Sequence, residues 1–131
     1  MTTRYVVTAG GREASVEMSE KGDQAAITVD GQTEKTAGPR AGAALWKGLG
    51  NAGLRANGIN LFVIKEAEGE GKIICTVPAV MEGAHVVWKV LYRADRNASC
   101  FKSLGSRTRI GDALDVAFAK LASEHEMPHK P

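Results

Sequence analysis

The stretch Arg109-Ile110-Gly111-Asp112-Ala113-Leu114-Asp115-Val116-Ala117-Phe118-Ala119-Lys120-Leu121 decides how the rest of this chain is interpreted. Its apolar residues recur every three or four positions, as they do on the buried stripe of an amphipathic helix. The members of that stripe are Ile110, Leu114, Ala117, Phe118 and Leu121. A helix is therefore predicted from about residue 109 to 123, with this stripe in the core.

A fainter copy of the stretch begins at Arg40. Arg40-Ala41-Gly42-Ala43-Ala44-Leu45 matches Arg109–Leu114 at Arg, Gly, Ala and Leu. A second helix is predicted over residues 40–54, but its glycines each cost about 1 kcal/mol relative to alanine in a helix interior. That helix must therefore be held by packing against the rest of the protein.

Strand-like patterns precede both helices. Residues 84–93 are predicted to form a long strand with an entirely apolar face (Ala84, Val86, Trp88, Val90 and Tyr92) and an opposite face that carries His85, Lys89 and Arg93. Asp30-Gly31 is a tight hairpin signal, because a primed turn needs positive φ at both central positions. The polar segment 32–36 is expected at a sheet edge, and the apolar run 61–64 is expected in the middle of a sheet.

The predicted fold class is α+β, with two four-stranded antiparallel β units that are each followed by a helix (ββββα-ββββα) and share one core. A length of 131 residues suits a single domain over residues 1–131. A pseudo-repeat of residues 1–58 and 59–126 is compatible with the matched hexapeptides, which could also match by chance. Either explanation leaves the element order unchanged.

The composition predicts a cytoplasmic protein. The net charge is only +2, no basic-then-apolar leader pattern starts the chain, and no apolar run approaches the length of about 20 residues that a membrane span needs. Cys75 and Cys100 make no disulfide framework and are expected to be buried.

Motifs with catalytic or cofactor chemistry are weak. Gly48-Leu49-Gly50-Asn51-Ala52-Gly53 has the spacing of a dinucleotide fingerprint, but it falls inside a predicted helix rather than between a strand and a helix. His125 and His129 have helix-like ligand spacing with Pro128 between them. Glu66, Glu68 and Glu70 fall in or beside a glycine-containing turn. No catalytic residue, metal site or cofactor is therefore predicted.

One segment is more basic than the rest. Residues 85–109 carry six Lys or Arg against Asp95 alone, a net charge of +5. The predicted binding residues are His85, Lys89, Arg93, Lys102, Arg107 and Arg109, and Lys65 and Lys72 are candidates to extend the group. A basic sheet face can follow a phosphate backbone. The alternative is a solvated face whose charges pair across strands with glutamates such as Glu66, Glu68 and Glu82.

The order of elements resembles the doubled plan of four strands and a helix in the Whirly and Pur families, whose members bind single-stranded nucleic acid. The resemblance lies in element order, so no residue role is carried over from it.

The function expected from the sequence is non-enzymatic binding of single-stranded nucleic acid through a basic sheet face. Two alternatives stay open. One is a small-molecule-binding protein or enzyme with a pocket between sheet and helix near Trp88 and His85. The other is a protein-interaction adaptor that acts as a homo-oligomer, because an exposed Trp46 on the glycine-rich helix would favour a homodimer.

Overall fold

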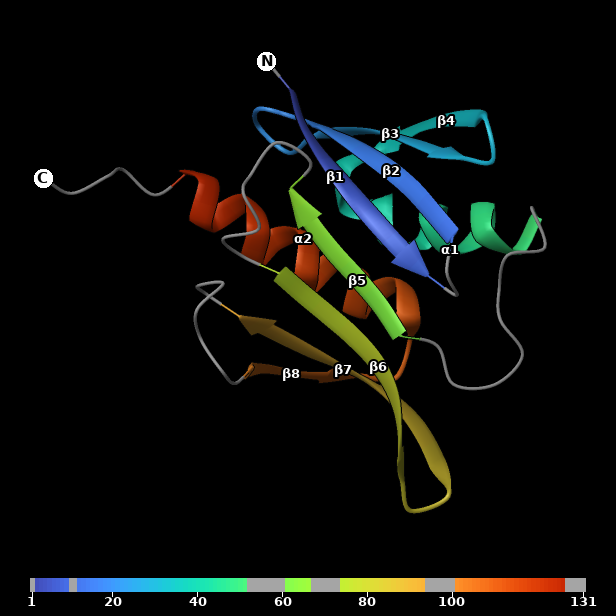
Figure 1. Ribbon diagram of the computed structural model, residues 1–131, viewed down its shortest axis with the longest axis vertical. Coiled ribbons are helices and arrows are strands. Elements are labelled where there is room, and N and C mark those ends of the chain that lie inside the picture. The colour runs from blue at the N-terminus through green and yellow to red at the C-terminus, as the bar shows by residue number, and fades with distance from the viewer. Residues whose placement is uncertain (1, 10–11, 52–60, 67–73, 94–100, 127–131) are drawn as a thin grey trace, which may run out of the picture.

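The computed structural model describes residues 2–9, 12–51, 61–66, 74–93 and 101–126. These residues form one antiparallel sheet of eight strands, two α-helices and a short 3-10 turn (Figure 1). In chain order the elements are β1 (Thr2–Ala9), β2 (Arg12–Ser19), β3 (Gln24–Val29), β4 (Gln32–Ala37), η1 (Gly38–Arg40), α1 (Ala41–Asn51), β5 (Leu61–Glu66), β6 (Ile74–Glu82), β7 (His85–Arg93), β8 (Lys102–Arg107) and α2 (Ile110–Glu126). The predicted α+β class is confirmed.

The strands lie in the order β4-β3-β2-β1-β5-β6-β7-β8. The predicted order of four strands and a helix, twice, is present, but the strands do not form two separate sheets. β1 pairs antiparallel with β5, with Val7 opposite Ile64. This ladder satisfies backbone groups that would otherwise leave β1 as an open edge, and it joins the two halves.

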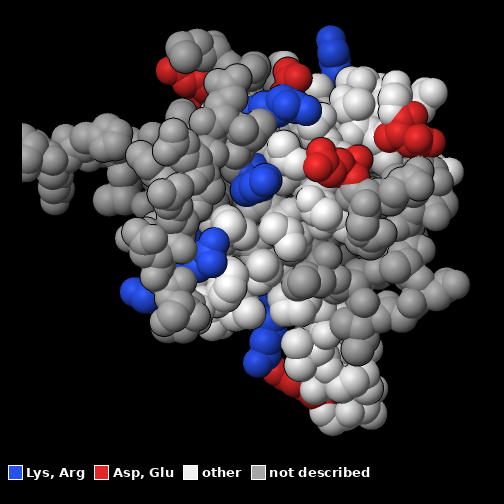
Figure 2. Space-filling view, in the orientation of Figure 1, with Lys and Arg blue, Asp and Glu red and all other residues white. Residues whose placement is uncertain are grey.

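Both helices cover the same face of the sheet, and the view of Figures 1 and 2 looks onto the opposite, helix-free face. Because side chains alternate along a strand, every second residue points towards the helices. These positions form one buried cluster with the helix stripes. The stripe predicted on α2 is in this cluster: Ile110, Leu114, Ala117, Phe118 and Leu121 are all buried.

The two helices cross where the matched hexapeptides meet. A Cβ on Gly42 would lie 2.3 Å from the Gly111 carbonyl oxygen, so only glycine allows this approach of the two backbones. The Gly42 backbone N–H donates a hydrogen bond of 2.8 Å to Oδ1 of Asp115. A carboxylate of α2 therefore satisfies one of the free N–H groups in the first turn of α1.

Several predictions for single elements are confirmed. Asp30 and Gly31 have φ of 52° and 80° in the β3–β4 turn, β4 lies at one edge of the sheet, and β5 lies inside it. Cys75 is buried, whereas Cys100 lies outside the described residues.

Two strands continue past residues that usually interrupt a strand. β6 continues through Pro78 to Glu82. Pro78 lies opposite Leu61, the first residue of β5, and the pairing of β6 with β7 is interrupted at this position. The strand therefore tolerates a residue that has no backbone N–H to donate. β8 likewise continues through Gly105, which takes a φ of 102° at an irregularity in the β7–β8 pairing.

Candidate functional site

Three of the predicted binding residues share one side of β7. His85, Lys89 and Arg93 are spaced four positions apart, so all three point to the same face, which is the helix-free one. His85 is exposed, and Lys89 and Arg93 are half-buried. The alternation of β7 thus places these groups where no helix covers them.

Neighbouring strands add two further cations to this face. Arg93 lies opposite Ile74 on β6, Ile74 lies opposite Lys65 on β5, and both pairings keep side chains on the same face. Lys65 in turn lies opposite Val6 on β1, two residues from Arg4. Lys65 is one of the two extensions that the sequence suggested, and the other, Lys72, lies outside the described residues. Arg4 was missed because the β1–β5 pairing that brings it here joins segments distant in the sequence. We call Arg4, Lys65, Lys89 and Arg93 the basic row.

The surface between these cations is uncharged and largely apolar. Val6, Val63, Ile74 and Leu91 point to the helix-free face and are half-buried. Figure 2 shows basic groups spaced along the face with uncharged surface between them. The acidic side chains described on this face are Glu13 and Glu17 on β2, of which Glu17 lies directly opposite Arg4, and Glu82 on β6, which lies opposite His85.

An exposed aromatic side chain lies beside the basic row. Phe101 is 41% exposed, and the Arg93 guanidinium carbon lies 5.6 Å from the centroid of its ring. This distance is within the range of a cation–π contact. Among the described residues, no acceptor meets the buried Nε of Arg93. Sequence reasoning missed Phe101, although its place next to a basic strand was a usable signal.

The remaining predicted cations lie elsewhere. Lys102 is opposite Tyr92 and Arg107 is opposite Trp88, and both of these partners point towards the helices. Lys102 thus lies on the strand next to Lys89 and Arg93, but the register places its side chain on the other side of the sheet. Arg109 lies in the connection between β8 and α2 and is exposed.

The predicted pocket near Trp88 and His85 cannot form as described. These residues are three apart on β7, so they point to opposite faces of the sheet. Trp88 is partly buried against the core, and its ring lies 6.0 Å from that of Trp46 in an edge-on contact. Trp46 is thus not an exposed aromatic, and the argument for a homodimer from its exposure fails.

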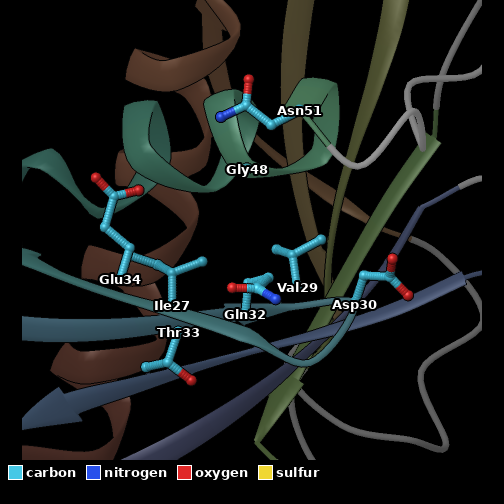
Figure 3. Close-up of a pocket in the computed structure, with 8 residues that line it drawn as sticks. All are labelled: Ile27, Val29, Asp30, Gln32, Thr33, Glu34, Gly48 and Asn51. Atoms are coloured by element: carbon cyan, nitrogen blue, oxygen red, sulfur yellow. The ribbon is translucent and has the colours of Figure 1, made fainter.

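A different cavity lies between α1 and the β3–β4 hairpin (Figure 3). Its volume is about 420 Å³. Ile27 and Val29 form an aliphatic floor, Gly48 and Asn51 of α1 form the opposite wall, and polar residues from the hairpin line the rest: Asp30, Gln32, Thr33 and Glu34.

The other candidate chemistry finds little support in the geometry. The first two glycines of the dinucleotide-like motif, Gly48 and Gly50, lie inside α1, and α1 itself follows η1 rather than a strand. The third, Gly53, lies outside the described residues. The described residues contain no group of His, Cys, Asp and Glu that could hold a metal ion. His125 falls in α2, and His129, Glu68 and Glu70 lie outside the described residues.

Cys75 has no catalytic character. Burial raises the pKa of its thiol to about 12, against the smaller lowering effect of the Lys120 charge. Its Sγ lies 3.8 Å from the Ala117 carbonyl oxygen. A thiol with this pKa stays protonated near neutral pH, so it is a poor nucleophile.

Neither described helix has the length and apolar character to span a bilayer. Comparisons with protein-family models, with curated proteins and with solved structures found no match to this chain.

Proposed function

We propose that this protein binds single-stranded nucleic acid, without catalysis, on the helix-free face of its sheet. The observation that carries the proposal is the basic row beside an exposed Phe101, on a face that no helix covers. The order of four strands and a helix, twice, also resembles the Whirly and Pur families, which supports the same class of ligand by analogy. In this proposal the two halves are related units that meet at β1 and β5.

The cations are spaced suitably for phosphates. Lys65 and Arg93 lie in one cross-strand line with β6 between them. Adjacent strands are about 4.8 Å apart, so these two residues start roughly 10 Å from each other. A nucleic-acid strand that crosses β1, β5, β6 and β7 would pass each member of the basic row in turn.

Phe101 and the apolar surface provide for the bases. Stacking of a base on an aromatic ring contributes about 1–3 kcal/mol and tolerates any sequence. Paired bases in a duplex do not offer their faces to such a ring, so the arrangement favours single strands. Lys102, Arg107 and Arg109 lie outside this path and are expected to add only long-range attraction.

The test is fluorescence anisotropy with a labelled oligothymidine at several salt concentrations. Four phosphate contacts predict a slope of about −3 in a plot of log affinity against log salt, because each contact on a single strand contributes about −0.7. Lys65→Gln or Arg93→Gln should each make the slope shallower by about 0.7. The matched control is Lys47→Gln, which removes one charge from an exposed position on α1, on the other side of the sheet.

Phe101→Ala separates stacking from charge. It should weaken binding by about 5- to 150-fold and leave the salt slope unchanged. A duplex should compete poorly with the single strand. The proposal is wrong if no binding occurs at ~50 mM salt with tens of micromolar protein, or if Lys47→Gln weakens binding as much as Lys65→Gln does.

A further inference from the structure

We propose that the cavity between α1 and the β3–β4 hairpin binds a small aliphatic diamine. This site is separate from the proposed nucleic-acid face, because its floor lies on the helix-covered side of the sheet.

The cavity lies beside the core, between the side chains of β4 and the surface of α1. On the helix side of the hairpin, Gln32 lies opposite Val29 and Glu34 lies opposite Ile27. The two β3 residues are buried, whereas both β4 residues are exposed. At Gly48 the helix places no side chain in the cavity, and an added Cβ there would lie 3.3 Å from Cγ2 of Val29.

The charge of the lining is negative. Asp30 and Glu34 are carboxylates, the amides of Gln32 and Asn51 are further polar groups, and none of the described residues that line the cavity is a lysine or an arginine. Figure 3 shows Glu34 and Asp30 towards opposite ends, with Ile27, Gln32 and Val29 between them. The lining therefore offers two separated anionic ends and an aliphatic middle.

These features select a ligand class. Ammonium groups form charge-assisted hydrogen bonds with carboxylates, and a chain of methylene groups can lie over Ile27 and Val29. The same carboxylates repel anions. A volume of about 420 Å³ is within the usual range for small-molecule pockets. A linear molecule with an amine at each end matches all three properties.

The experiment is a two-dimensional 15N NMR titration of the whole protein near pH 7 at low salt. The probes are 1,5-diaminopentane, the neutral 1,5-pentanediol and the anionic pentanedioate, which share one chain length. The diamine should cause saturable shifts in amides of residues 27–34 and 48–51. The diol and the dianion should cause none there. Equal responses to diamine and diol would overturn the proposal, as would the absence of any saturable response.

Two variants locate the site. Glu34→Gln keeps the size of an exposed side chain and should weaken diamine binding about tenfold, and Gly48→Leu should abolish it by filling the cavity. The control is Glu17→Gln, which removes a carboxylate from the helix-free face. The proposal fails if Glu34→Gln binds the diamine as the native protein does, or if Glu17→Gln weakens it equally.

Discussion

At the scale of single residues, Asp115 is the titratable group with the clearest structural role. It accepts a hydrogen bond from the backbone of Gly42, yet its net pKa is raised from 3.8 to about 6. Burial is the main cause, the Gly42 hydrogen bond opposes it, and the nearby charge of Asp112 adds to it. The native state therefore binds this proton more tightly than the unfolded chain does.

The sign of the pH dependence follows from that difference. Between about pH 4 and pH 6 the folded protein holds more protons than the unfolded chain, so stability falls as pH rises through this range. The loss should be about 1 kcal/mol, because solvent screens a carboxyl that is only partly buried. Urea unfolding at pH 4 and pH 7 should show this loss in the native protein and not in Asp115→Asn. The comparison variant Asp112→Asn changes an exposed position of the same helix and should retain most of the stability loss between pH 4 and pH 7. Identical pH profiles for the native protein and Asp115→Asn would contradict the assignment.

At the scale of elements, the helix crossing depends on Gly42. Alanine would be favoured over glycine by about 1 kcal/mol from helix propensity alone. Here its Cβ would meet the backbone of Gly111, so Gly42→Ala should instead destabilise the protein by about 1–3 kcal/mol, the usual cost of overpacking. Gly48→Ala is the comparison, because its Cβ would approach only a side-chain methyl of Val29. Urea denaturation should show the larger loss for Gly42→Ala; an equal or smaller loss would mean that the two helices can move apart.

Elements with local signals were predictable from the sequence, and their mutual placement was not. The period of α2 and the alternation of β7 are properties of short segments, so the buried stripe and the shared face of His85, Lys89 and Arg93 could be read directly. The pairing of β1 with β5 leaves no local trace, and Arg4 was missed for that reason. The face on which Lys102 lies was not predictable either, because a shift of one residue in register moves every side chain of a strand to the other face.

At the scale of the whole molecule, the two halves share their core. Tyr5 of β1 packs against Phe118 of α2, with ring centroids 5.8 Å apart, and both belong to one buried cluster with residues from α1. Each half alone has only about 60 residues, which is marginal for independent folding. We therefore expect both halves to unfold together.

Native-state hydrogen exchange in increasing urea measures this cooperativity. The amides of Val16 in β2 and Val77 in β6, one from each half, should reach the same free energy of opening with the same dependence on urea. Protection that is lost in one half while it persists in the other would show that the prediction of one domain over residues 1–131 is wrong.

The pairing of β1 with β5 also sets an order of events during synthesis. β1 leaves the ribosome about fifty residues before its partner β5, which begins at Leu61. Until then a growing chain can complete β1–β4 and still present one side of β1 to its surroundings. Two nascent chains close together on one messenger could pair there and exchange strands. The β1–β5 ladder, which joins the two halves of the finished protein, is thus also a point at which nascent chains can exchange strands during synthesis.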